Sequence, residues 1–221
     1  MLDNGDSTLI ITPKGKKILI DGGEEQNILV PYLLARKIKK IDYIIISHFD
    51  SDHVGGILTV IEKLNVKTII ISKQTNSNEN YEAFKQIVMK RHINVVNVKT
   101  GDKINIEKNV YFSIIWPGDI SITRDDNLNN NSLVCKLNHG NFSILFTGDI
   151  ENVAESKILE NDKNLLNSTI LKVAHHGSNS SSTEKFIKAV NPQIALIGVG
   201  QNNKFGHPNK VVLERLENIR N

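Results

Sequence analysis

A cluster of histidine and aspartate side chains in one short stretch of the chain could hold a metal ion. The cluster contains His48, Asp50, Asp52 and His53, which are two imidazoles and two carboxylates. On an extended segment the first three side chains would project to the same side, and His53 follows where the chain turns. Imidazole and carboxylate donors that converge on one point suit a divalent cation such as Zn, Mn or Fe. Each residue taken singly is explained as well by a polar turn with an aspartate helix cap.

Two regular elements must position this cluster. The apolar run Tyr43-Ile44-Ile45-Ile46 predicts a buried strand before it. After it, Gly55-Gly56 leads into an apolar-rich run from Ile57 to Leu64, which predicts a helix. The cluster therefore lies where a strand ends and a helix follows, an edge at which binding and catalytic side chains gather.

Further polar groups follow later strands in the same way. Asp149, the pair His175-His176 and His207 each come after an apolar run, and these runs cover residues 142–147, 169–174 and 193–198. The plain alternatives are a helix N-cap for Asp149 and a surface turn for His207. Alternating strands and helices come first and a strand-rich middle follows, which indicates a mixed α/β protein.

The composition is that of an ordinary globular chain. Its 221 residues are 39% hydrophobic and 23% charged, and we expect a single domain over residues 1–221, shortened at both ends. The net charge of +3 is compatible with an anionic substrate but does not by itself indicate nucleic acid. The lone cysteine, Cys135, excludes an internal disulfide framework and is expected in the core. The sequence shows neither a signal peptide nor an apolar run of the ~20 residues that a membrane span needs.

The motif His48-x-Asp50-x-Asp52-His53-x-Gly55-Gly56 resembles the HxHxDH metal motif of the metallo-β-lactamase superfamily. An aspartate at position 50 and a run similar to LKxxHHGSxxS from Leu171 resemble the ComEC-like branch of that superfamily. The T-G-D sequence at Asp149 resembles the superfamily's fourth motif, whose aspartate bridges two metals. The resemblance extends from about Leu9 to Leu216. It implies an α/β (α+β) fold of the αββα sandwich type, with two sheets packed face to face and helices outside.

The resemblance also implies a site for one or two divalent ions, Mn or Zn. The metal ligands that it implies are His48, Asp50, Asp52, His53, Asp149 and His175. The carboxylate of Asp50 is a harder ligand than the usual imidazole and shifts the expectation from Zn towards Mn. His176 is expected beside His175 in a catalytic or substrate role, and this assignment could be reversed. Asp21 is either a turn residue or a carboxylate that supports the metal ligands from behind.

The other implied roles concern catalysis and substrate binding. Asp52, His176 and His207 are the expected catalytic residues, and either histidine could protonate a leaving group. Ser178, Asn131 and Ser132 are the expected substrate contacts. The superfamily's third metal motif, often a histidine, has no counterpart in the Asn-rich loop that ends at Asn131, and the N-terminal stretch before residue 8 is shorter than is usual in the family.

Metal-dependent hydrolysis of a DNA phosphodiester is the function that the resemblance implies. Two alternatives stay open: hydrolysis of another ester, a lactone or a thioester, and a non-catalytic domain that binds nucleic acid or protein. A nucleic acid or another phosphodiester is the expected partner. The expected location is cytoplasmic if the chain acts alone, and extracytoplasmic or membrane-associated if it belongs to a ComEC-like membrane protein.

Overall fold

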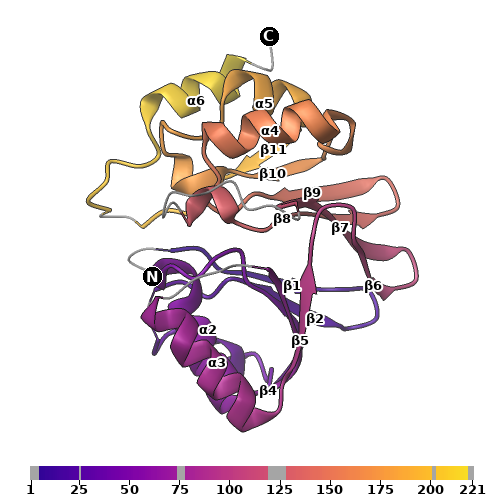
Figure 1. The fold of residues 1–221 in the computed structure, drawn as a ribbon, viewed down its shortest axis with the longest axis vertical. Helices are drawn as coiled ribbons and strands as arrows, with labels where there is room; N and C mark the ends of the chain where they lie inside the picture. The colour runs from indigo at the N-terminus through magenta and orange to yellow at the C-terminus, as the bar shows by residue number, and fades with distance from the viewer. Residues whose placement is uncertain (1–4, 25, 74–77, 119–127, 201–202, 219–221) are drawn as a thin grey trace. The chain divides into compact units, whose positions relative to one another are not determined.

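The chain divides into two compact units in the computed structural model, which describes residues 5–24, 26–73, 78–118, 128–200 and 203–218. Unit 1 comprises residues 1–98 with 200–202, and unit 2 comprises residues 99–199 with 203–221. Each unit contains one β-sheet, together with helices (Figure 1). The single domain expected over residues 1–221 stays a prediction.

The sheet of unit 1 has five strands in the order β1-β2-β3-β4-β5. Their bounds are β1 (Thr8–Ile11), β2 (Lys17–Ile20), β3 (Lys40–Ile45), β4 (Asn65–Ser72) and β5 (Asn94–Val98). The first two strands form an antiparallel hairpin, and β2 to β5 are parallel. Ile44, Ile45 and Ile46 are all buried, as expected of a parallel strand that is covered on both faces.

Three helices complete unit 1: α1 (Leu29–Ala35), α2 (Ser51–Lys63) and α3 (Glu79–Arg91). Helices α2 and α3 lie beside each other, and the apolar side of α2 fills the core of the unit (Figure 1). The extended segment expected as far as Asp52 is wrong, because α2 begins at Ser51. The N–H groups of His53 and Val54 both donate to the carbonyl of Asp50, so Asp52 and His53 lie in the first helical turn.

The sheet of unit 2 has six strands in the order β11-β10-β9-β8-β7-β6. Their bounds are β6 (Lys103–Glu107), β7 (Val110–Trp116), β8 (Val134–His139), β9 (Phe142–Phe146), β10 (Ile170–Lys172) and β11 (Ile194–Leu196). Strands β6 to β9 form an antiparallel meander, whereas β9, β10 and β11 are parallel. The parallel strands end on the same edge, where Asp149 and the paired histidines follow them.

Helices α4 (Asn152–Asp162), α5 (Glu184–Val190) and α6 (Lys210–Glu217) lie on one face of this second sheet (Figure 1). Short 3-10 segments occur at Asn129–Asn131, Lys163–Leu165 and Ala174–Gly177. The expected mixed α/β architecture with two sheets is confirmed, and Cys135 is a buried free thiol as expected. Among the described residues, no helix combines the length and the apolar character needed to cross a membrane.

Candidate metal centre

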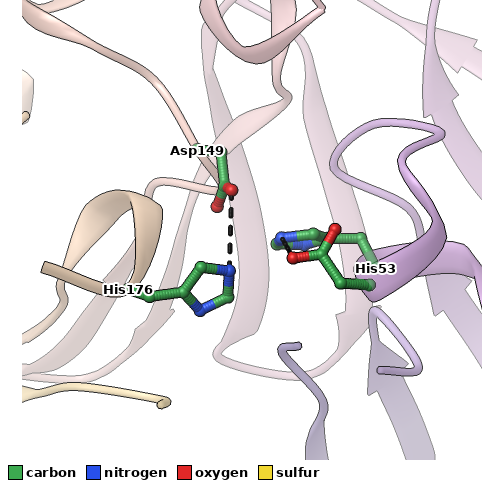
Figure 2. A group of neighbouring side chains, drawn as sticks. His53, Asp149 and His176 are labelled. Carbon is green, nitrogen blue, oxygen red and sulfur yellow. Dashed lines mark ion pairs between the residues drawn. The ribbon is translucent and has the colours of Figure 1, made fainter. Parts of the chain in front are cut away.

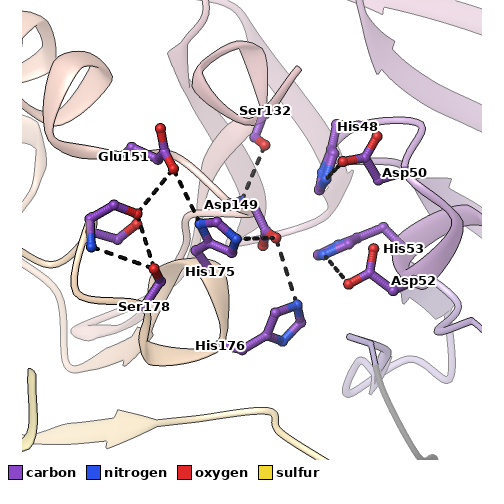
Figure 3. Close-up of polar contacts among 12 residues, drawn as sticks. His48, Asp50, Asp52, His53, Ser132, Asp149, Glu151, His175, His176 and Ser178 are labelled. Atoms are coloured by element: carbon purple, nitrogen blue, oxygen red, sulfur yellow. Dashed lines mark hydrogen bonds and ion pairs between the residues drawn. The ribbon is translucent and has the colours of Figure 1, made fainter. Parts of the chain in front are cut away.

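Four of the expected metal ligands lie at the junction of β3 and α2 in unit 1. The rings of His48 and His53 are fully buried, with centroids 4.2 Å apart. His48 Nε2 lies 3.6 Å from Asp50 Oδ2, and His53 Nε2 lies 3.9 Å from Asp52 Oδ2 (Figure 3). The carboxylate side chains are 40% and 31% exposed. Each buried imidazole thus directs Nε2 towards a carboxylate that solvent can reach.

Asp21 and Ser47 hold the opposite edges of the two imidazoles. Asp21 follows β2 and accepts hydrogen bonds from Ser47 N at 2.8 Å and Ser47 Oγ at 2.7 Å. Its Oδ2 also lies 3.0 Å from His53 Nδ1, and Ser47 Oγ lies 2.9 Å from His48 Nδ1. A carboxylate behind Nδ1 is typical of histidines that bind metal through Nε2. Of the two roles left open for Asp21, this geometry matches support of the histidines from behind.

Neither Asp50 nor Asp149 caps a helix with its side chain, which was the plain alternative to metal binding. Asp50 occupies the N-cap position of α2, but its side chain makes no capping hydrogen bond. In unit 2, α4 begins at Asn152 with Glu151 at its N-cap position, so Asp149 lies outside the helix. Neither carboxylate is committed to a helix end.

Asp149 is fixed through its backbone at the end of β9. Its N–H donates to Ser132 Oγ at 3.1 Å, and its side chain is only 5% exposed. Asp149 Oδ2 lies 3.6 Å from His176 Nε2 and 3.9 Å from His175 Nε2. Figure 2 marks the first of these ion pairs with a dashed line. Both adjacent histidines therefore face the same carboxylate oxygen.

The two histidines differ in what their Nδ1 atoms contact. His176 Nδ1 donates to the carbonyl of Gly198 at 2.8 Å, which leaves Nε2 as the lone-pair nitrogen of a neutral ring. His175 Nδ1 is buried, makes no hydrogen bond and lies 3.6 Å from Glu151 Oε1. Positive φ values of 48° and 53° at these residues turn the chain so that both rings can reach Asp149. The arrangement of His176 is the one expected of a metal ligand.

Glu151 is a functional candidate that sequence analysis missed. Its Oε1 accepts a hydrogen bond from Ser180 Oγ at 3.0 Å, and its Oε2 accepts one from Asn130 Nδ2 at 3.3 Å. Asn130 Oδ1 in turn accepts from the N–H groups of Glu151 and Ala154 at the start of α4. In the sequence Glu151 is indistinguishable from an ordinary acidic residue at a helix start. Ser47 was missed too, although its place between a strand and His48 is a usable signal.

The expected substrate contacts occupy different settings. Ser132 is fully buried and holds the backbone of Asp149, whereas Asn131 is half-buried in the adjoining 3-10 segment. Ser178 is buried, with its Oγ 3.0 Å from Ser180 Oγ. The short N-terminal stretch before residue 8 and the loop before Asn131 fall partly at residues 1–4 and 119–127, outside the described residues.

His207 lies in the loop between β11 and α6. Its ring centroid is 5.9 Å from that of His175, and its Nδ1 is buried without a hydrogen bond. Burial lowers the pKa of His207, and the neighbouring His175 and His176 lower it further, although Asp149 acts in the opposite direction. The structure thus brings together His207, the paired histidines and Asp149 within unit 2, and the four residues of the β3–α2 junction within unit 1.

Comparison with known proteins gives a consistent family match. A family model described as the metallo-beta-lactamase superfamily matches residues 2–200. ComE operon protein 3 of Bacillus subtilis is 31% identical over 98% of this chain, and Recombination protein 2 of Haemophilus influenzae is 31% identical over 96%. The chain spans only 30% and 25% of these two relatives. Among solved structures, Igni18, a metallo hydrolase from Ignicoccus hospitalis, has a TM-score of 0.63 and 13% identity over 100% of this chain and 89% of that protein, which is a likeness of fold.

Proposed function

Since the chain belongs to the metallo-β-lactamase superfamily, we propose that it is a metal-dependent phosphodiesterase that cleaves DNA. The superfamily fold places metal ligands at the ends of strands, where this chain has its histidines and aspartates. One relative has the name Recombination protein 2, and recombination is a process that nucleic acids undergo. Both facts support a nuclease and leave the choice of substrate to experiment.

The observation that carries this proposal is the orientation of the two buried imidazoles in unit 1. Both Nδ1 edges face the Asp21–Ser47 pair, and both Nε2 edges face carboxylates. His48 Nε2 is buried and has no hydrogen bond, which is costly unless another group fills the position. A divalent cation would satisfy this nitrogen and offset the repulsion between the nearby carboxylates. The residues present therefore fit a metal ion.

The proposed ligands are His48, Asp50, Asp52, His53, Asp149 and His176. His176, and not His175, is the proposed ligand, because His176 Nδ1 donates a hydrogen bond to the carbonyl of Gly198. The ions are Mn or Zn, one or two in number, and the carboxylate of Asp50 favours Mn. Asp149, which faces both histidines through one oxygen, is the proposed bridging ligand if two ions bind.

A divalent cation held there would acidify a water molecule and offset the charge on the phosphate oxygens. The protein's own part is to orient ligands and substrate. Asp52 is the proposed proton acceptor besides being a ligand, and His175 and His207 are the proposed contacts for the leaving oxygen. Ser178 and Asn131 are the proposed phosphate contacts. Ser132 acts through Asp149, because its hydroxyl accepts the Asp149 N–H.

Cleavage of an end-labelled single-stranded DNA tests the proposal. Chelator-treated protein should be inactive, and Mn or Zn should restore cleavage. His176→Asn should reduce kcat by roughly 100-fold or more, because a lost ligand removes transition-state stabilisation. His139→Asn is the matched control, since His139 is exposed at the end of β8, and it should keep full activity.

Two other outcomes would reject a nuclease. Stoichiometric metal without DNA cleavage, together with hydrolysis of a lactone or thioester, would assign the chain to ester chemistry. Neither metal binding nor cleavage would identify a non-catalytic binding domain.

A further inference from the structure

The loop from Asn203 to Asn209 in unit 2 is fixed at several points. Asn203 Oδ1 accepts a hydrogen bond from His207 N at 2.9 Å, and Asn203 Nδ2 donates to His207 O at 2.7 Å. Asn209 N donates to the carbonyl of Gly177 at 2.8 Å, which ties the loop to the residue after the paired histidines. The side chain of Asn203 thus closes a turn around three residues, Lys204 to Gly206, whose shape is set by hydrogen bonds.

This closed turn presents an aromatic ring to solvent. Phe205 is 75% exposed, the highest value among the large hydrophobic residues that the structure describes. Its ring stacks on that of His207, with a centroid separation of 6.0 Å and an interplanar angle of 22°. The His207 ring lies 5.9 Å from His175, and the His175 ring lies 6.3 Å from His176. The rings of His176, His175, His207 and Phe205 therefore form a row, in which each ring neighbours the next, from the proposed ligand to the exposed phenyl group.

An exposed phenyl ring alone would carry no function, since single apolar residues are common on protein surfaces. Here the backing by His207, the closed turn and the link to the paired histidines fix the ring relative to a candidate phosphodiester site. The neighbouring Lys204 is also exposed. A planar apolar face and a cation beside a phosphodiester site match the chemistry of a nucleotide, which has a flat base and an anionic phosphate.

We propose that Phe205 is a stacking platform for an unpaired nucleobase of the substrate, with Lys204 contacting an adjacent phosphate. This inference rests on the proposed phosphodiesterase function and defines the substrate as a single-stranded nucleic acid. Bases inside a duplex are stacked on their neighbours and offer no free face to a protein ring. A phosphodiester without bases offers no planar partner for Phe205.

The test compares two single strands of equal length and charge, one of thymidines and one of abasic sites. Their dissociation constants are measured by fluorescence anisotropy in EDTA, so that neither strand is cleaved. The wild-type protein should bind the thymidine strand roughly tenfold more tightly, the order expected for stacking of one base. Phe205→Ala should bring this ratio close to one, and Phe205→Trp should preserve it.

Two matched variants separate stacking from general damage. Phe142→Ala removes another exposed phenyl ring of the same unit, on β9, and should leave the ratio unchanged. Lys204→Gln should weaken the binding of both strands equally. It should also reduce the slope of log K against log salt by about one. A wild-type ratio of one, or a ratio that Phe205→Ala does not change, would overturn the inference.

Failure of the inference is distinguishable from failure of the proposed function. If the wild-type protein cleaves neither strand in the presence of metal, the phosphodiesterase function is rejected. The ratio of the two dissociation constants in EDTA would still report on Phe205. Metal-dependent cleavage of both strands with equal KM would reject the stacking platform alone. If both proposals hold, Phe205→Ala raises KM about tenfold for the thymidine strand and leaves KM for the abasic strand unchanged.

Discussion

Asp21 is the residue on which the orientation of His53 depends. Its Oδ2 lies 3.0 Å from His53 Nδ1 and also accepts the hydroxyl of Ser47. Asp21→Asn replaces one carboxylate oxygen with an NH2 group, which cannot accept either hydrogen bond. Because such supporting contacts are typically worth 10- to 100-fold in metal affinity, we expect calorimetric titration with Mn or Zn to show a loss of about that size.

Asp42→Asn is the control for this loss, because Asp42 is a buried carboxylate of the same unit that contacts the β1–β2 hairpin instead of the histidines. It should leave metal affinity unchanged. An Asp21→Asn variant with wild-type affinity would mean that His53 does not bind the metal or does not need this support.

Asp42 provides a separate prediction about pH. Burial by itself would raise the pKa of its carboxyl, but the N–H of Lys17 and the ammonium of Lys16 outweigh burial, so the pKa is lowered below the ordinary 3.8. A lowered pKa in the folded state means that the carboxylate stabilises the protein above pH 3.8 and loses this effect as the pH falls through the folded pKa. Asp42→Asn should therefore cost up to about 1 kcal/mol near pH 7, since Lys16 is partly exposed.

Urea unfolding of the Asp42→Asn variant at several pH values measures this effect. The difference from wild type should shrink below pH 3.8. Glu160→Gln, at an exposed position on α4, is the control and should cost little stability near pH 7. A difference that stayed constant down to pH 2 would show that packing, and not charge, explains the loss.

At the scale of elements, the first two turns of α2 pass directly against the backbone that follows β2. Gly22 N donates to the carbonyl of His53 at 2.6 Å, and Gly56 N donates to that of Gly23 at 2.9 Å. A Cβ atom at Gly56 would clash with the carbonyl oxygen of Gly22. This close contact brings the segment that contains Asp21 up to His53, so the glycines position the candidate ligands.

Gly56→Ala tests this contact, because the contact determines whether the change raises or lowers the free energy of unfolding. In an exposed helix the change would stabilise by roughly 0.5–1 kcal/mol. Here overpacking against the Gly22 carbonyl should instead destabilise the protein by about 1–3 kcal/mol, measured by urea unfolding. Gly118→Ala is the control, because a Cβ atom there would meet nothing within 4 Å. A neutral or stabilising Gly56→Ala would show that α2 can move away from Gly22 without cost.

The elements that sequence predicts well are those with strong local signals. The Ile-rich strand before His48 forms as predicted. Helix α5 shows another local signal, because Thr183 Oγ1 accepts a capping hydrogen bond from Phe186 N. The predicted start of α2 at Ile57 is wrong, because the helix begins at Ser51. Gly55 and Gly56 suggest a turn in the sequence, whereas the contact with Gly22 requires them inside the helix.

The site shows the same division between local and long-range information. Histidines and aspartates in a dense motif are visible from their spacing. The residues that support these ligands cannot be recognised from spacing, because Glu151 and Asn130 are 21 positions apart and meet only when the chain folds. The difference between His175 and His176 also depends on a distant group, the carbonyl of Gly198, which no local pattern contains.

At the scale of the whole molecule, each unit has its own apolar core. A ligand that binds only the folded protein stabilises it by about 2.7 kcal/mol at a concentration 100 times its Kd, which for a chain of this size raises Tm by roughly 5–10 °C.

Trp116 makes this stabilisation measurable, because it is the protein's single tryptophan and lies in β7. Its fluorescence should report the metal-induced rise in Tm in the wild-type protein. His53→Asn should abolish most of the rise, since the metal would lose a ligand. His92→Asn is the control: His92 is an exposed histidine of unit 1 with φ of 52°, a conformation that Asn accepts, and the rise should persist. Persistence of the rise in His53→Asn would instead mean that His53 does not hold the metal, and its role as a ligand would have to be abandoned.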